Sequence, residues 1–385
     1  MLYGERNMKI AMVINTTDTY KTREIEELCK CNKDETINVY YILDNDEGVP
    51  LKNKETNLFE ETYLKKGRFF GRVLNNHRGL INIVRSNDVI FIGGYEESSY
   101  IILGILCKLL KKPYVIIVDG IIRSREGEKE STFNLFLKNF IVSEASYIWA
   151  SGKMVYKDLI EFFQYPSKKI FPKYLTVDGE KIINLYPERK SIREEIRRKY
   201  GISNEAKVIN YAGNLTTSNN VKVIIKAIAT LKRDDIVLLI TGDGAEKLSL
   251  LYMAKKKNVK VIITGFIEKK EDLFKNYYAS DLFVLPSMYE PWGLVVNEAM
   301  YARLPIIVSE HCGCALDLVE GNGYVFNPRN STDLASKIDK IFYSDSSKDR
   351  GEVSYNKILN WSFEKSAKSF KDLISNIRKL QEENS

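Results

Sequence analysis

The stretch DLFVLPSMYEPWGLVVNEAM, residues 281–300, decides the fold of this chain. Its first part, residues 281–286, is apolar and ends at a proline, which predicts a short buried strand. A loop that contains Glu290 follows, and a proline and a glycine then open an apolar helix. Glu298 lies about two turns into that helix. The order strand, loop, helix is the repeating unit of a parallel α/β sheet.

Two carboxylates beside the start of this helix indicate a type of ligand. A helix N-terminus offers unpaired N–H groups and the positive end of a dipole, and both suit an anionic group. The carboxylates of Glu290 and Glu298 can accept hydrogen bonds from hydroxyl groups. An anion that carries several hydroxyls describes a nucleotide sugar, so we expect this chemistry at residues 290–298.

Length and composition set the broad class. A chain of 385 residues is long for one domain, and its 44% hydrophobic content is enough for a sizeable core. The net charge, 58 − 51 = +7, permits attraction to an anionic lipid or nucleotide but does not imply nucleic acid. The five cysteines are odd in number, the first residues are polar, and the longest apolar run, 100–110, is too short to span a bilayer. We expect a cytoplasmic protein without a disulfide framework.

Alternating strands and helices repeat twice along the chain and predict two doubly wound α/β domains. Strands of the first series are expected at residues 9–14, 38–43, 88–94, 112–120, 147–150 and 169–175. Strands of the second series are expected at residues 207–213, 236–244, 259–265, 281–286, 304–309 and 323–326. Residues 182–189 are the predicted linker, which gives domains at 1–183 and 184–361.

A basic segment in the first domain has two interpretations. Residues 64–76 are predicted to form a helix in which lysines and arginines alternate with aromatic and aliphatic residues. Such a helix could lie on an anionic membrane, so residues 64–78 are a candidate for peripheral contact at the inner face of the membrane. The alternative is a surface helix whose apolar stripe faces the core.

Asp119 stands at the predicted carboxyl end of the strand at residues 112–120. Ligands of open α/β sheets bind at such ends, which makes Asp119 a candidate for the acceptor site. An ordinary turn-capping role for its side chain is the alternative.

Several motifs in the second half resemble those of the retaining glycosyltransferases of family 4, which have the GT-B fold. They cover about 130 residues in the family's order and spacing. The motifs that carry the resemblance are residues 211–213, 242–244, 265–266, 278–287, 290–298, 304–306 and 321–326. The resemblance implies two Rossmann-like doubly wound domains facing a cleft, with a final helix, residues 362–385, that crosses back to the N-terminal, acceptor-binding domain. It also implies the polysaccharide-building branch of the family.

The resemblance assigns roles to individual residues. Glu298 would bind the ribose hydroxyls of the donor, and Glu290 would contact hydroxyls of the donor sugar. The remaining donor-site residues implied by the motifs are Gly213 and Gly242, the backbone around Trp292, Gly293 and Leu294, and Asp317 at the end of the loop 311–317. Asp119 occupies the place of a loop histidine that is common in the family, and residues 16–19 replace its glycine-rich turn.

The phosphate half of the expected site departs from the family pattern. The family has an arginine and a lysine that clamp the diphosphate, and here these positions are Asn214 and Asn219. Neutralising the leaving group is the main electrostatic task of such an enzyme. Lys222, Lys153 or Arg123 could supply the missing charge. A less anionic leaving group, or an inactive protein, would also explain the change.

The expected chemistry needs neither a side-chain nucleophile nor a metal. The chain has only two histidines and no pairing of a nucleophile with a base. In the family, the departing phosphate is thought to take the acceptor's proton during front-side attack. His311, Cys312 and Cys314 offer soft ligands, but structural zinc sites draw on separated pairs, so no metal cofactor is expected.

The sequence thus predicts a retaining glycosyltransferase. It would move a sugar from a nucleotide-diphosphate donor to a glycan or lipid-linked acceptor in the synthesis of cell-surface polysaccharide. Two alternatives stay open: a non-catalytic binding or partner subunit of the same fold, and a nucleotide-sugar epimerase. Asn214 and Asn219 favour the former, whereas the motif at residues 290–298 disfavours the latter.

Overall fold

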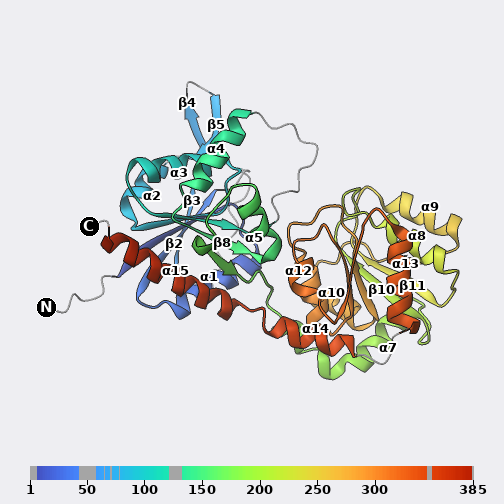
Figure 1. The fold of residues 1–385 in the computed structure, drawn as a ribbon. Coiled ribbons are helices and arrows are strands. Elements are labelled where there is room, and N and C mark those ends of the chain that lie inside the picture. Colours follow the sequence, from blue (N-terminus) through green and yellow to red (C-terminus); the bar gives the residue numbers. More distant parts are fainter. Residues whose placement is uncertain are drawn as a thin grey trace. The chain divides into compact units, whose positions relative to one another are not determined.

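The computed structural model describes residues 7–42, 58–64, 66–69, 72–77, 79–120, 132–344 and 349–383. The chain forms two compact units (Figure 1). Unit 1 comprises Met1–Leu175 and Ser362–Ser385, and unit 2 comprises Thr176–Trp361. Each unit is built on its own parallel sheet with helices packed against it, so the predicted pair of Rossmann-like doubly wound domains is confirmed.

The sheet of unit 1 has seven parallel strands in the order β3-β2-β1-β6-β7-β8-β9. Its strands are β1 (Met8–Ile14), β2 (Glu35–Ile42), β3 (Glu60–Leu64), β6 (Val89–Ile92), β7 (Tyr114–Val118), β8 (Tyr147–Ser151) and β9 (Ile170–Lys173). Its helices are α1 (Thr19–Cys31), α2 (Leu80–Ser86), α3 (Ser98–Leu109), α4 (Thr132–Ser143), α5 (Gly152–Glu161) and α15 (Phe363–Glu383). Strand order reverses between β1 and β6, and at such a point the loops after the two strands diverge and leave a crevice.

Helix α15 belongs to the core of unit 1, although it comes from the other end of the chain. Its Phe370 is fully buried, with its ring centroid 5.6 Å from that of Trp149 and 5.0 Å from that of Phe91. Figure 1 shows this helix alongside α1. Burying these aromatic rings ties the C-terminal segment to the first sheet.

Residues 64–76 do not form the predicted helix. The structure has β4 (Lys66–Phe69) and β5 (Arg72–His77), which pair antiparallel as a small sheet of their own. Alternating basic and apolar residues in a short segment fit both a helix face and a strand. Here the antiparallel pairing of β4 with β5 makes the segment a pair of strands. The amphipathic helix that motivated a membrane contact at residues 64–78 is therefore absent. Within the described part of the chain, no helix is long and apolar enough to cross a membrane.

The sheet of unit 2 has six parallel strands in the order β12-β11-β10-β13-β14-β15. Its strands are β10 (Lys207–Ala212), β11 (Ile236–Thr241), β12 (Lys260–Ile263), β13 (Leu282–Leu285), β14 (Ile306–Ser309) and β15 (Gly323–Phe326). Its helices are α6 (Glu180–Ile183), α7 (Arg189–Lys199), α8 (Lys222–Leu231), α9 (Lys247–Lys257), α10 (Lys270–Tyr278), α11 (Leu294–Tyr301), α12 (Ala315–Leu318), α13 (Ser331–Asp339) and α14 (Arg350–Leu359). The order reverses between β10 and β13.

The division between the units falls after Leu175, earlier than the predicted boundary at residues 183/184. Helix α6 explains the difference, because it packs on unit 2. The hydroxyl of Tyr278 donates to the carbonyl of Ile182 over 2.6 Å, and Asn297 donates to Thr176 over 3.4 Å. The segment that the sequence predicts as a linker is thus part of the second fold.

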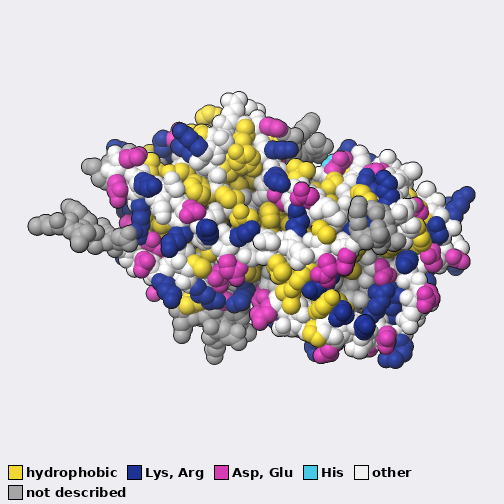
Figure 2. Space-filling model, turned by 60° about the horizontal axis from the view of Figure 1, so that its bottom comes forward, with side chains coloured by type: hydrophobic (Ala, Val, Ile, Leu, Met, Phe, Trp, Pro, Cys, Tyr) yellow, Lys and Arg dark blue, Asp and Glu magenta, His cyan; other side chains and the backbone are white. Residues whose placement is uncertain are grey.

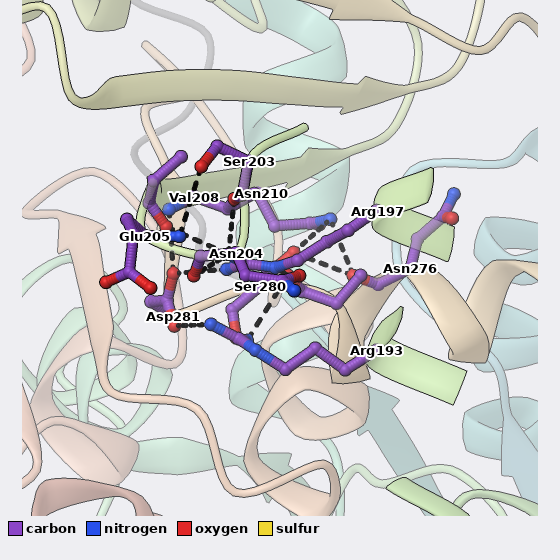
Figure 3. Close-up of polar contacts among 12 residues, drawn as sticks. Arg193, Arg197, Ser203, Asn204, Glu205, Val208, Asn210, Asn276, Ser280 and Asp281 are labelled. Atoms are coloured by element: carbon purple, nitrogen blue, oxygen red, sulfur yellow. Dashed lines mark hydrogen bonds and ion pairs between the residues drawn. The ribbon is translucent and has the colours of Figure 1, made fainter. Parts of the chain in front are cut away.

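A buried arginine organises the amino end of the unit 2 sheet (Figure 3). Arg197, on α7, has no exposed surface, and its guanidinium donates to Asp281 over 2.8 Å. It also donates to four backbone carbonyls, those of Ser203, Asn204, Ala206 and Ala279. Asp281 in turn accepts the N–H of Val208 over 2.8 Å. The network therefore joins α7 to the starts of both β10 and β13.

Charge is well mixed on one face of the molecule. On the face shown in Figure 2, lysine and arginine side chains are interspersed with aspartate and glutamate side chains. This agrees with the small net charge of +7.

Replacing Arg197 by methionine tests the network at the amino end. We expect Arg197→Met to lower the free energy of unfolding by about 3 kcal/mol or more, because buried carbonyls lose their donor. Arg193→Met is the matched control, since Arg193 pairs with the same Asp281 but its side chain is 33% exposed. Its loss should cost about 1 kcal/mol or less. Equal losses in urea denaturation would contradict the assigned role.

Candidate functional site

The carboxyl edge of the unit 2 sheet gathers the predicted donor-site residues. They lie on the four loops that come after β10, β11, β13 and β14 and on the helices α11 and α12, which follow the last two of these loops. The residues in chain order are Gly213, Asn214, Asn219, Gly242, Glu290, Trp292, Gly293, Leu294, Glu298 and Asp317. Because all these strands are parallel and their order reverses between β10 and β13, their carboxyl ends meet at the crevice where open α/β sheets bind ligands.

Two loops of this edge are bonded to each other through their backbones. The N–H of Gly213 donates to the carbonyl of Thr241 over 3.0 Å, and that of Leu215 donates to Asp243 over 2.9 Å. A Cβ at Gly242 would overlap the carbonyl oxygen of Gly213. Only glycine fits at position 242, so the loops after β10 and β11 form one fixed surface.

A second pair of loops is joined in the same way. The N–H of Glu290 donates to the carbonyl of His311 over 3.2 Å, and that of Gly313 donates back to Glu290 over 3.0 Å. A Cβ at Gly313 would overlap the carbonyl oxygen of Pro291. The loop after β13, which carries Glu290, is therefore held by the loop after β14.

Glu298 lies on α11 and is 8% exposed. The hydroxyl of Tyr277, on α10, donates to one of its carboxylate oxygens over 2.8 Å. Burial raises the pKa of Glu298, while the Tyr277 hydrogen bond and the charge of Lys270 oppose that rise. A carboxylate has about four acceptor positions, so the bond from Tyr277 leaves acceptor capacity for a ligand's hydroxyls. Tyr277 was missed in the sequence, because an aromatic residue on a helix reads as core.

Glu290 is the second carboxylate of the edge. Burial raises its pKa as well, and a hydrogen bond from the backbone N–H of Trp292 lowers it in part. The two glutamates differ in their partners: Glu298 is oriented by a side-chain hydroxyl and Glu290 by the backbone. Different partners fit the separate roles that the motifs imply for them.

The Trp292 ring lies in the core of unit 2. It is 2% exposed, it stacks on Trp361 with ring centroids 5.3 Å apart, and its indole N–H donates to Asn297 over 3.1 Å. Gly293, with φ 95°, then caps α11, whose first residue is Leu294. The ring thus anchors the helix start. The backbone N–H of Trp292 is donated to Glu290, so the N–H groups offered to a ligand here are those of Gly293 and Leu294.

The loop after β10 holds neutral groups where the related family has cations. The side chain of Asn219 accepts a hydrogen bond from Thr216, and the carbonyl of Asn214 accepts one from Tyr211 over 2.8 Å. One nearby lysine is paired: Lys247 forms an ion pair with Asp243 over 2.7 Å. The loop's Thr217 donates to Glu246 over 3.3 Å.

The three cations considered as replacements lie in different parts of the chain. Lys222 is the first residue of α8, the helix that continues the loop after β10. Lys153 is on α5 of unit 1. Arg123 lies outside the described residues. Lys222 is therefore the one of the three that the fold attaches directly to this loop.

The loop after β14 carries Asp317, His311 and two cysteines. Asp317 is 8% exposed in α12, and one ring nitrogen of His311 lies 3.0 Å from the carbonyl of Met288. Burial raises the pKa of both the Cys312 and the Cys314 thiols. Across the described ranges, no group of three or more histidine, cysteine, aspartate or glutamate side chains could hold a metal ion.

Asp119 lies in unit 1, directly after β7. Its carboxylate makes ion pairs with Lys21 over 2.6 Å and with Lys173 over 2.7 Å. Burial favours the neutral acid, but the two lysines outweigh it and hold the pKa of Asp119 well below its usual range. The sequence alone did not reveal this pairing, because both lysines are distant in the chain.

Comparison with known proteins relates the second unit to glycosyltransferases. The family model for glycosyl transferases group 1 matches residues 192–358. An uncharacterized glycosyltransferase of Methanocaldococcus jannaschii is 30% identical over 204 residues, 51% of this chain and 51% of that protein. The alpha-D-kanosaminyltransferase of Streptomyces kanamyceticus is 30% identical over 154 residues, 39% of each. The chain thus spans about half, or less, of the curated relatives it matches.

The whole chain resembles solved structures in its fold. The crystal structure of Anabaena HepE in complex with UDP has a TM-score of 0.73 with this chain at 19% identity. The alignment covers 97% of this chain and 100% of that one. The likeness confirms the predicted GT-B fold, and residues 192–358 of unit 2 are similar to the glycosyl transferases group 1.

Replacing Glu298 by glutamine tests its buried carboxylate. Because the folded state raises the pKa of Glu298, the native chain binds more protons than the unfolded chain between the ordinary and the raised pKa. In the wild type, the contribution of Glu298 to the free energy of unfolding is fully present below about pH 4 and is lost as the pH rises through the raised pKa. Glutamine does not titrate. Relative to wild type, Glu298→Gln should therefore gain free energy of unfolding between about pH 4 and pH 7 in urea denaturation.

Glu195→Gln, on the exposed face of α7, is the control for this measurement. A stability difference between Glu298→Gln and wild type that does not change with pH would contradict a perturbed carboxylate. A difference that moves in the opposite direction would place the pKa of Glu298 below its ordinary value.

Proposed function

We propose that this protein is a retaining glycosyltransferase of family 4 that takes its sugar from a nucleotide-diphosphate donor. The acceptor would be a glycan or a lipid-linked sugar in cell-surface polysaccharide synthesis, and the reaction would take place in the cytoplasm. The observation that carries the proposal is the pair Glu290 and Glu298 at the crevice between β10 and β13. The glycosyltransferase relatives and the UDP bound to the similar HepE fold support it.

Each group at the edge has a task in this proposal. Glu298, oriented by Tyr277, accepts hydrogen bonds from the ribose hydroxyls, and Glu290 accepts them from the donor sugar. Backbone N–H groups at the start of α11 bind phosphate or sugar oxygens. The backbone at Gly213 and Gly242 lies against the diphosphate without an intervening side chain. Asp317 binds the base or the ribose.

The transfer step would balance without a side-chain nucleophile. The acceptor's hydroxyl oxygen forms a bond to the anomeric carbon of the donor, and the bond from that carbon to the phosphate oxygen breaks. The departing phosphate takes the hydroxyl proton on the same face, so the configuration is retained. Positioning and charge stabilisation then supply the catalysis. The nucleotide sugar is a substrate, and the step calls for no metal cofactor, since backbone N–H groups and Lys222 would meet the phosphate charge.

A non-catalytic binding subunit is the second candidate. The specific observation in its favour is the neutral loop at Asn214 and Asn219, with the carboxylate of Glu246 bonded to the same loop. Such a loop would stabilise a departing diphosphate poorly. A nucleotide-sugar epimerase is a further alternative, and product analysis with nucleotide sugar alone would separate it. A membrane contact through residues 64–78 loses its physical basis, since strands β4 and β5 occupy most of that segment.

A thermal-shift screen of nucleotide-diphosphate sugars tests donor binding. We expect at least one of them to raise the Tm, because a ligand at about 100 times its Kd stabilises the fold by about 2.7 kcal/mol. Glu298→Ala should abolish the shift while its circular dichroism stays native. Glu195→Ala, an exposed glutamate on α7, should keep the shift. If no nucleotide sugar shifts the wild-type Tm at millimolar concentration, the proposed function fails.

Restoring the cations tests where the diphosphate lies. The double variant Asn214→Arg and Asn219→Lys should bind UDP at least about tenfold more tightly, because a hydrogen bond to a charged group contributes about 1.5–3 kcal/mol. Isothermal titration calorimetry gives the Kd, and Glu205→Lys, at an exposed position of unit 2, controls for net charge. An unchanged Kd would show that the diphosphate does not lie at residues 214–219. Tighter binding without any transfer to acceptors would favour the non-catalytic candidate.

A further inference from the structure

Unit 1 contains a cluster of four charged side chains at the carboxyl edge of its sheet. Lys21 and Glu24 lie on α1, Asp119 follows β7, and Lys173 ends β9. Lys173 lies 2.9 Å from Glu24 and 2.7 Å from Asp119, and Lys21 lies 3.1 Å from Glu24 and 2.6 Å from Asp119. Each lysine therefore contacts both carboxylates. We call these four residues the ion cluster.

The ion cluster is buried except at one member. The side chains of Lys21, Glu24 and Lys173 are 5%, 2% and 0% exposed, whereas that of Asp119 is 29% exposed. Taking charges out of water is expensive, and apolar residues of similar size would be at least as stable there. Ionisable groups held at this cost mark functional sites more often than chance. Asp119 is thus the one member of the cluster that a ligand can reach.

The bonds to Asp119 limit what it can still accept. One oxygen accepts a hydrogen bond from the hydroxyl of Ser151, which lies 3.2 Å away, and the other accepts one from Lys21. Lys173 adds an ion pair over 2.7 Å without a hydrogen bond. About four acceptor positions exist on a carboxylate and hydrogen bonds fill two of them, so capacity is left for a hydroxyl donor.

The charge of the ion cluster sets the class of the ligand. Two lysines and two carboxylates sum to zero, so these four described residues by themselves offer no net attraction to a phosphate or a carboxylate. The oxygen exposed by Asp119 would repel an anion at short range. An uncharged hydroxyl avoids this repulsion and can donate to Asp119.

A buried hydroxyl nearby is also without a protein partner. Among the described residues, the hydroxyl of Tyr100 has no hydrogen-bond partner although the residue is 1% exposed. A Cβ at Gly93 would lie 2.8 Å from it and 2.9 Å from the carbonyl of Val13. The hydroxyl therefore lies over the ends of β1 and β6, where the strand order of unit 1 reverses. Buried polar groups normally have partners, and an unpaired one at a ligand-binding edge points to a polar ligand.

We propose that Asp119 binds one hydroxyl group of an uncharged sugar or polyol acceptor without taking its proton, and that Lys21 and Lys173 are positioning residues for its carboxylate. The inference rests on the proposed function, because the acceptor is the second substrate of the transfer. The inference restricts the chemical class of the acceptor: the part of the acceptor that reacts would be an uncharged group that carries a hydroxyl.

Among the described residues around Asp119, the two lysines oppose its protonation and the carboxylate of Glu24 favours it. Lys21 and Glu24 face it from α1, Lys173 from β9, and the hydroxyls of Tyr20 and Tyr100 interact with it electrostatically from α1 and α3. Burial alone would favour the neutral acid, and the two lysines reverse this, so the pKa of Asp119 lies well below its usual range. A carboxylate that stays ionised is a poor general base but a constant hydrogen-bond acceptor.

Binding of two matched probes tests the inference. Methyl α-glucopyranoside is neutral and glucose 6-phosphate is anionic, and NMR of the full chain follows the amides of Val118 and Ser151. At equal concentration, the neutral probe should shift these amides more in the wild type. Asp119→Asn removes one negative charge from the ion cluster, so the preference should turn to glucose 6-phosphate. Lys108→Met, which breaks an exposed ion pair with Glu144, should leave the wild-type order.

If the Asp119→Asn variant does not fold, a pH titration of Asp119 in the wild type still tests the inference. The side-chain 13C signal of Asp119 in the wild type should remain that of a carboxylate down to the lowest pH at which the chain is folded. A midpoint at or above about pH 4, the ordinary aspartate range, would overturn the inference. So would stronger binding of the anionic probe by the wild type, or no response of Val118 and Ser151 to the neutral one.

UDP binding on the same samples separates this inference from the proposed function. If UDP binds and the neutral probe is not preferred, the inference about Asp119 fails alone. If the neutral probe is preferred and UDP does not bind, the proposed function fails.

Discussion

The parallel pairing of β10 with β13 is the constraint on which the candidate site depends. These strands are adjacent in the sheet although β11 and β12 lie between them in the chain, so their following loops run in opposite directions. The Arg197 network joins the starts of both strands at the amino end. Close backbone contacts at Gly242 and Gly313 then fix the loops at the other end. A glutamate on a loop and a glutamate on a helix are thereby held at one edge.

Much of this arrangement could be predicted from the sequence because it is encoded locally. Apolar runs that end in glycine or proline located the strands, and the spacing of Glu290 and Glu298 placed one on a loop and the other on α11. Contacts between distant segments could not be predicted in this way. The sequence pattern around Tyr277 indicates a core residue and gives no sign of its bond to Glu298. No residue close to Asp119 in the chain indicates that Lys21 and Lys173 pair with it. Residues 64–76 were assigned to a helix because a short mixed pattern fits both periodicities, and antiparallel pairing produces strands instead.

The carboxyl edges of the two sheets differ in their charged side chains. In unit 2, the edge that would receive a diphosphate has the buried Glu298 and the half-buried Glu290, both with raised pKa values, and a loop of neutral side chains. In unit 1, two buried lysines are fully matched by two carboxylates. Asn214 and Asn219 bring no cation to the unit 2 edge, so oriented N–H groups and hydroxyls, together with Lys222 at the start of α8, would have to do most of the binding. Such preorganised dipoles can stabilise a departing anion in a site from which water is excluded.

Hydrogen–deuterium exchange with and without UDP tests the central claim, that four loops of unit 2 form one nucleotide-diphosphate site. The account predicts slower exchange in the presence of UDP at residues 213–219, 242–246, 290–298 and 311–317. Exchange at the amino end of the same sheet, around residues 203–208, should stay unchanged. Protection confined to other parts of the chain, or no protection at saturating UDP, would contradict the account.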